Sequence, residues 1–105
     1  MMARFDVRAN LNRSSRERVP YLLELQSDLL AGLRTRLVAP LVPAARFGPP
    51  ASRLNPVLRI GSRNFVMDTA LMAGVPAAQL GDRVASLRER SADLLGALDF
   101  LVSGI

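Results

Sequence analysis

The spacing of the apolar residues changes along this chain, and that change constrains the fold more than any other feature. As far as Pro76, apolar residues alternate with polar ones or gather in short runs, as they do in strands. From Val84 to Val102 they recur at every third or fourth position, which is typical of one helix face. Strands followed by one terminal helix predict a mostly β fold, with an open or barrel-like antiparallel sheet and the helix laid against it.

Three segments in the first half of the chain are expected in strands. Residues 4–10 alternate strictly between apolar and polar side chains. Residues 21–25 follow a proline, which a strand tolerates near its start or on the edge of a sheet. Residues 37–42 contain Pro40, which cannot donate to a neighbouring strand. This last segment is therefore predicted to be a bent or edge strand.

The middle of the chain carries the clearest turn signals. Residues 43–56 are rich in proline and glycine and predict a loop. Residues 57–60 and 63–67 flank a Gly-Ser pair, which suits a tight two-residue hairpin. Residues 71–75 form one more short apolar piece, closed by a proline.

The tail is expected to be one helix from about residue 82 to residue 102. Asp82 is the predicted N-cap, and Gly104 is predicted to end the helix. The apolar stripe of this helix is expected to pack on the core. With 105 residues, the chain fits a single domain over residues 1–105.

The absence of two residue types narrows the chemistry. The chain has no Cys, which excludes disulfides and thiolate zinc sites, and no His, the commonest general base. It has no glycine-rich phosphate loop and no nucleophile-elbow pattern. We therefore expect a protein that is not an enzyme and needs no cofactor or metal. Residues 26–28 are predicted to form a strand-end turn with side-chain capping, because no base accompanies Ser27.

The formal charge is +5, and all fourteen basic residues are arginines. Arginine pairs well with carboxylates and phosphates, so an acidic protein segment or a nucleic acid is a candidate partner, beside a merely solvated surface. Arg13, Arg16 and Arg18 cluster in a polar loop, either solvated or docking an acidic segment. No basic-aromatic stripe is present, so direct sequence-specific nucleic-acid binding is not expected. No apolar stretch is long enough to cross a bilayer, and the N-terminus is unlike a secretory signal, so a cytoplasmic location is expected.

Several short stretches, taken in order, resemble the CcdB family of bacterial toxins. They are LQSDLL (25–30), RTRLVAPL (34–41), NPVLRIG (55–61), MAGVP (72–76) and the terminal GI (104–105). Each is short, but together they span nearly the whole chain. The resemblance implies an SH3-like antiparallel sheet with a small side sheet and a C-terminal helix. It also implies a homodimer and a cognate antitoxin whose flexible acidic segment wraps the toxin.

The function that this resemblance implies is that of the toxin in a type II toxin-antitoxin system. Such toxins bind the A subunit of DNA gyrase and trap the complex with cleaved DNA, without chemistry of their own. The gyrase-binding positions carried over from the family are Leu29, Leu30, Asp99, Val102, Ser103, Gly104 and Ile105. From the residues alone, the leucines suit core or turn packing, and the last two residues suit a frayed tail.

Three of these positions depart from the well-studied toxin, which has Asn, Phe and Trp where this chain has Asp99, Val102 and Ser103. That Trp stacks on an arginine of gyrase, and losing such an anchor costs about 2–4 kcal/mol in binding. One alternative is therefore a degenerate, non-toxic homologue that only dimerises and binds antitoxin. Another is a ribonuclease toxin of the same fold, which would have to work with arginines and carboxylates.

Overall fold

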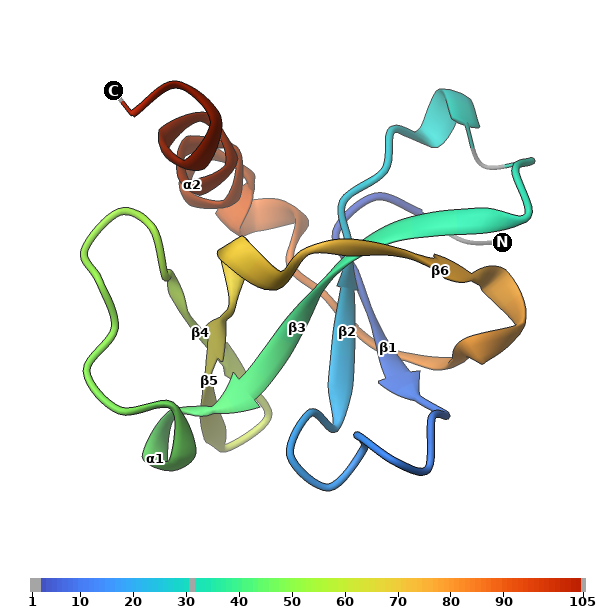
Figure 1. The fold of residues 1–105 in the computed structure, drawn as a ribbon, viewed down its shortest axis with the longest axis horizontal. Coiled ribbons are helices and arrows are strands. Elements are labelled where there is room, and N and C mark those ends of the chain that lie inside the picture. Colours follow the sequence, from blue (N-terminus) through green and yellow to red (C-terminus); the bar gives the residue numbers. More distant parts are fainter. Residues whose placement is uncertain (1–2, 31, 105) are drawn as a thin grey trace.

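The computed structural model describes residues 3–30 and 32–104, within which the strands form one curled antiparallel sheet (Figure 1). The strands are β1 (Asp6–Asn10), β2 (Tyr21–Glu24), β3 (Thr35–Pro43), β4 (Val57–Ile60), β5 (Arg63–Met67), β6 (Ala73–Pro76) and β7 (Leu80–Ser86). Their order is β4-β5-β3-β2-β1-β7, and β6 pairs with β3 beside this path. The helices are α1 (Ala44–Phe47) and α2 (Ser91–Ser103). The 3₁₀ turns are η1 (Asp28–Leu30), η2 (Thr69–Leu71), η3 (Ala77–Gln79) and η4 (Arg88–Arg90).

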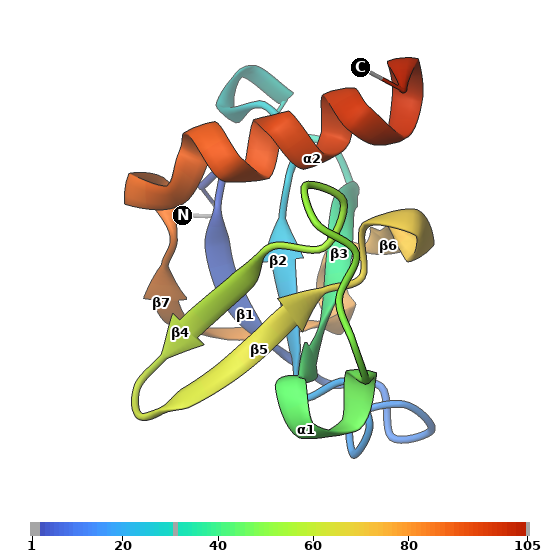
Figure 2. The ribbon, with the colours of Figure 1, turned by 90° about the vertical axis from the view of Figure 1, so that its left-hand side faces the viewer.

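Helix α2 lies across one face of the sheet, as Figure 2 shows. Its buried residues Leu94 and Ala97 join the main core cluster with Val7, Leu23, Leu41, Leu58 and Phe65 from the strands. A second cluster, which includes Val19, Leu22, Val38, Val42 and Leu80, is separate from the first. The prediction of a mostly β fold with one C-terminal helix is confirmed.

Strand β3 is central, so the predicted edge position is wrong. It pairs with β2 on one side, and on the other side with β6 through residues 35–38 and with β5 through residues 41–43. Pro40 lies between these two partners, and its carbonyl accepts a hydrogen bond from the Asp68 N–H at 2.9 Å. A strand residue's N–H and C=O point to the same side, so the missing donor of Pro40 falls in the gap between β5 and β6.

The predicted helix of residues 82–102 is wrong over residues 82–90. Residues Leu80–Ser86 form β7, which pairs antiparallel with β1, and α2 begins only at Ser91. Asp82 therefore lies in a strand and is not an N-cap. Val84 is 45% exposed, so it is not part of the core stripe, whereas Leu87 is buried. Pairing with a strand some seventy residues away along the chain outweighed the local three-to-four spacing.

The predicted hairpin is confirmed, because β4 and β5 are joined by Gly61 and Ser62. Gly61 has a φ of +62°, a conformation that L side chains rarely adopt. The predicted loop of residues 43–56 is right for most of its length, but it opens with the short helix α1. Of the predicted apolar piece of residues 71–75, residues 73–75 belong to β6, whereas Leu71 ends η2.

Candidate binding surface

The two groups of predicted gyrase-binding residues lie at the same end of the molecule. We call residues 27–30 the leucine turn; it contains η1 and lies at the upper right in Figure 1. The C-terminal end of α2, residues 99–104, lies at the upper left (Figure 1). The fold therefore brings both groups to one end of the protomer but on opposite sides of it. Ile105, the last predicted residue, lies outside the described residues.

Leu29 and Leu30 project outward. Leu29 is 94% exposed and Leu30 is 49% exposed, so neither belongs to the core. Leu33, which follows nearby and is also exposed, widens this apolar surface. Leu33 was not among the predicted binding residues, since its only signal in the sequence is an apolar residue between Gly32 and Arg34. Exposed leucines this close together mark a surface suited to a partner.

The leucine turn is hydrogen-bonded at its base by Ser27, which confirms the predicted side-chain capping. The Leu29 N–H donates to Ser27 Oγ at 3.3 Å, and the Leu30 N–H donates to the Ser27 carbonyl at 2.9 Å. Asp28 Oδ1 accepts from the Arg4 N–H at 2.6 Å, and its other oxygen lies 3.6 Å from Arg88 Nη2. The turn is thus tied to the N-terminal segment and to η4, which leads into α2.

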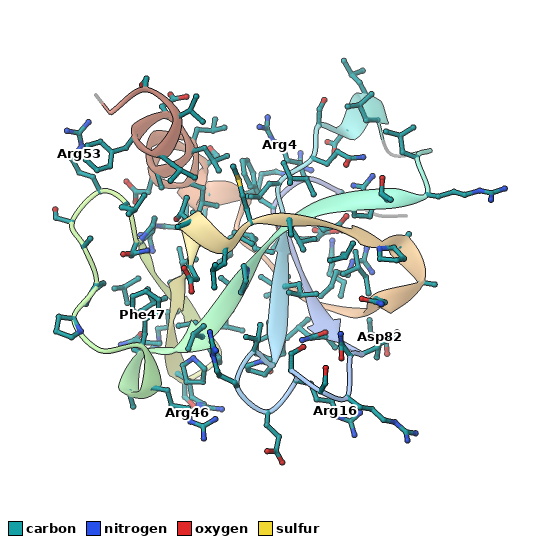
Figure 3. The ribbon with its side chains drawn as sticks, in the orientation of Figure 1. Arg4, Arg16, Arg46, Phe47, Arg53 and Asp82 are labelled. Carbon is teal, nitrogen blue, oxygen red and sulfur yellow. The ribbon has the colours of Figure 1, made fainter. Side chains whose placement is uncertain are left out.

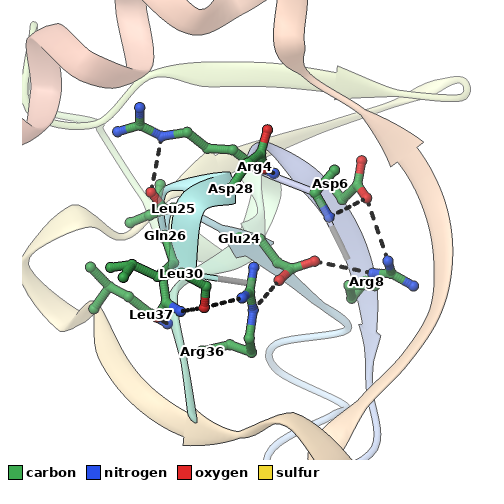
Figure 4. Close-up of polar contacts among 11 residues, drawn as sticks. Arg4, Asp6, Arg8, Glu24, Leu25, Gln26, Asp28, Leu30, Arg36 and Leu37 are labelled. Atoms are coloured by element: carbon green, nitrogen blue, oxygen red, sulfur yellow. Dashed lines mark hydrogen bonds and ion pairs between the residues drawn. The ribbon is translucent and has the colours of Figure 1, made fainter. Parts of the chain in front are cut away.

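The carbonyl of Leu30 is the point where the turn meets the sheet (Figure 4). Gln26 Nε2 donates to it at 2.9 Å and Arg36 Nη1 at 3.3 Å. Gln26 Oε1 accepts from the N–H of Leu37 in β3 at 3.1 Å. One amide side chain therefore bridges the turn and the central strand.

Beneath this carbonyl lies a buried ion pair that was not predicted from the sequence. Arg36 Nε lies 2.7 Å from Glu24 Oε1, and both side chains are 0% exposed. Glu24 Oε2 lies 3.2 Å from Arg8 Nε, and Arg8 Nη2 lies 3.4 Å from Asp6 Oδ2. The only sign of this ion pair in the sequence is a charged residue within an apolar run, as Glu24 is within residues 21–25.

The C-terminal end of α2 presents mainly backbone and small side chains. Val102 is 77% exposed, and Asp99, Ser103 and Gly104 are exposed as well. Gly104 has a φ of +73° and its N–H donates to the Phe100 carbonyl at 2.9 Å, so the predicted end of the helix is confirmed. Ser103 Oγ donates to the Asp99 carbonyl at 2.6 Å, which turns this hydroxyl back onto its own helix.

Asp99 shares a shallow concave surface with a residue from the loop of residues 43–56. The guanidinium of Arg53 stacks over the ring of Phe100, 4.6 Å from its centroid, beside α2 (Figure 3). The concavity is lined by Arg53, Ala92, Asp93, Gly96 and Asp99. Arg53 could not be recognised in the sequence, because its proximity to α2 depends on the path of a long loop.

Arg13, Arg16 and Arg18 are exposed in the loop between β1 and β2. This loop, residues 11–20, lies at the lower end of the molecule, away from the leucine turn (Figures 1 and 3). It is held by the buried Asn10, whose Nδ2 donates to Ser15 Oγ and to the Val19 carbonyl. We call the three arginines the basic loop.

Two structural findings bear on the kinds of site present. Within residues 3–30 and 32–104, no three Asp, Glu, His or Cys side chains gather closely enough to hold a metal ion. In the same residues, no helix is both long enough and apolar enough to span a membrane.

Comparison with known protein families gives one match that covers nearly the whole chain. The model of the family described as CcdB protein matches residues 4–104. CcdB toxins are non-enzymatic gyrase poisons, so the prediction that this protein is not an enzyme is supported by its family, and the ribonuclease alternative is not. The chain belongs to the CcdB family, and membership implies the general function of a gyrase-poisoning toxin with gyrase and an antitoxin as partners.

Proposed function

We propose that this protein is the toxin of a type II toxin-antitoxin system, and that it binds the gyrase A subunit and traps the cleaved-DNA complex. The observation that carries this proposal is the exposure of Leu29, at 94%, on a hydrogen-bonded turn. A fully exposed leucine gains nothing in the free protein and becomes favourable only when a partner covers it. Gyrase acts on DNA in the bacterial cytoplasm, and the toxin would act there too.

The C-terminal end of α2 is the second part of the proposed gyrase surface. Val102 offers apolar area, and Asp99 offers a carboxylate to an arginine of the partner. Ser103 offers no aromatic ring, and its hydroxyl is already bonded to the Asp99 carbonyl. The leucine turn therefore carries a larger share of the binding energy in this protein than the helix end does.

We propose that the active species is a twofold homodimer, in which each protomer supplies one leucine turn and one helix end. Apolar residues beyond the gyrase positions support a further interface. Leu71 is exposed on η2, and Leu95 is partly exposed on α2.

We propose that the basic loop binds the acidic segment of the antitoxin. The three arginines are exposed, and Arg46 of α1 adds a fourth positive charge, since its Nη1 donates to the Glu17 carbonyl at 3.2 Å. Figure 3 shows Arg16 and Arg46 at the same lower end of the molecule. Clustered arginines favour a partner rich in carboxylates.

Trapping of the gyrase cleavage complex tests the function. Purified protein, gyrase and supercoiled DNA are incubated, and the linear DNA released after denaturation is measured. We expect linear DNA with the wild type, and its loss with the double variant L29S/L30S. Leu11→Ser is the matched control, because Leu11 is a half-exposed loop leucine outside the proposed surface; it is expected to behave as the wild type.

Ser103 favours one second candidate, a homologue that dimerises and binds antitoxin but does not poison gyrase. The same experiment separates the two. Absence of linear DNA with the wild type, together with antitoxin binding, would refute gyrase poisoning and select this candidate.

A further inference from the structure

We propose that Gln26 and Arg36 are positioning residues, which hold the Leu30 carbonyl so that Leu29 and Leu30 meet a partner in a preset geometry. The identity of the partner rests on the proposed function, whereas the positioning is a property of the free protein. Neither residue needs to touch the partner for this role.

The first support is the convergence of donors on one oxygen. The Leu30 carbonyl accepts from Gln26 Nε2 at 2.9 Å, from Arg36 Nη1 at 3.3 Å and from the Leu33 N–H at 3.1 Å. A carbonyl oxygen has two lone pairs, so three donors saturate it. The backbone at the tip of the turn is therefore fixed from the protein side while the leucine side chains face outward.

The second support is that both donors are themselves fixed. Gln26 is held at its other end by the Leu37 N–H. Arg36 is fully buried, and its Nε is bound to Glu24 Oε1 at 2.7 Å. Because a guanidinium is planar, fixing Nε also fixes the direction in which Nη1 points. The geometry of β2 and β3 is thus passed on to the turn.

The third support is that the buried Arg36–Glu24 pair is an inefficient means of stabilising the fold, which suggests a further role. A buried ion pair repays its desolvation only when geometry and further hydrogen bonds are good. Arg36 Nη2 is buried and has no hydrogen-bond partner within the described part of the chain. Preorganising a binding element lowers the ordering cost of association, which gives the pair a use beyond stability.

The decisive experiment is a double-mutant cycle between Gln26→Met and Leu29→Ala, read as affinity for the gyrase A subunit. Methionine keeps the length of glutamine but removes both hydrogen bonds. We expect Gln26→Met to weaken binding about tenfold, corresponding to one ordered side chain. In the Leu29→Ala background the same change is expected to have a clearly smaller effect, because one of the two leucine contacts that Gln26 positions is already gone.

Gln79→Met is the matched control, since Gln79 is another half-buried glutamine, in η3. It is expected to leave the affinity unchanged in both backgrounds. Equal, additive losses for Gln26→Met in both backgrounds would show a general structural effect and overturn the proposal.

A second measurement needs no partner. NMR relaxation of the backbone amides reports the order of the turn in the free protein. Gln26→Met is expected to increase the motion of Leu29 and Leu30 and to leave Val102 unchanged. Arg36→Lys is expected to do the same, because lysine keeps a charge for Glu24 but lacks the planar fork that also reaches Leu30.

The two measurements separate the two proposals. If the wild type fails to bind gyrase A but the variants loosen the turn, the gyrase function fails and the positioning role stands. If the turn keeps its order in both variants, the positioning role is overturned whatever the gyrase result.

Discussion

The two carboxylate oxygens of Glu24 bind two different arginines: Oε1 lies 2.7 Å from Arg36 Nε, and Oε2 lies 3.2 Å from Arg8 Nε. These residues come from β2, β3 and β1, so one acidic side chain links three neighbouring strands. Glu24 and Arg36 are fully buried and Arg8 nearly so. The two arginines beneath the leucine turn are therefore balanced by two carboxylates, and Glu24 is the one that contacts both arginines.

Glu24→Gln should lower the free energy of unfolding by about 3 kcal/mol or more. The change keeps the shape of the side chain but leaves a buried guanidinium uncompensated. Urea denaturation measures the loss. Asp93→Asn is the control, because the Asp93–Arg90 pair is exposed and worth at most about 1 kcal/mol. Equal effects of the two changes would contradict the importance assigned to the buried network.

Leu29→Ser should separate function from stability. We expect the unfolding free energy to change by less than about 0.5 kcal/mol, because the side chain makes almost no contact with the rest of the protein. Leu94→Ala should instead cost about 2–5 kcal/mol, because Leu94 is fully buried on the core-facing side of α2. Thermal unfolding beside a gyrase-binding assay checks both. A large stability loss in Leu29→Ser would mean that the leucine supports the fold.

Ser103→Trp should increase gyrase affinity and growth inhibition. An aromatic anchor at an interface contributes about 2–4 kcal/mol, which is at least about thirtyfold in affinity. The lost hydrogen bond to the Asp99 carbonyl is a back-bond within a helix and costs little. Ser62→Trp, in the β4–β5 hairpin, is the control for nonspecific stickiness. Failure of Ser103→Trp to gain affinity would indicate that the interface has diverged more widely, for example at Asp99.

Replacing the basic loop with glutamines, as R13Q/R16Q/R18Q, should weaken binding of an acidic antitoxin peptide by at least about tenfold at low salt. Screening by salt should shrink the difference between variant and wild type. Fluorescence anisotropy at several salt concentrations measures both trends. Arg59→Gln, an exposed arginine on β4, is the control. An affinity that does not depend on salt would exclude charge pairing as the basis of antitoxin binding.

Local signals in the sequence predicted the parts of the fold that local physics decides. Gly61 predicted the hairpin because only certain residues accept a positive φ, and Gly104 predicted the helix end for the same reason. Asp82 was wrongly predicted to be a helix N-cap, because the spacing of the apolar residues near it fits either a helix or a strand. These residues form a strand because they pair with β1, which is distant in the sequence and so leaves no signal in the residues around Asp82.

The candidate site also has a part that could be predicted from the sequence and a part that could not. The resemblance to the CcdB family predicted Leu29 and Leu30, and the structure exposes both. The residues beneath them, Arg36 and Glu24, could not be identified, because their burial follows from the register between β2 and β3. Twelve residues separate the two, and nothing in either segment names the other as its partner.

The open order of the sheet leaves β4 and β7 each with a single neighbouring strand within the described residues. The unpaired N–H and C=O groups of such an edge strand can pair with the edge strand of another copy. Asp82 and Arg83 on β7 and Arg59 on β4 are exposed charges along these edge strands. Charged side chains on an edge strand disfavour its pairing with the edge of another copy. Asp82, which the sequence suggested as a helix cap, is thus one of the charged side chains expected to oppose edge-to-edge aggregation.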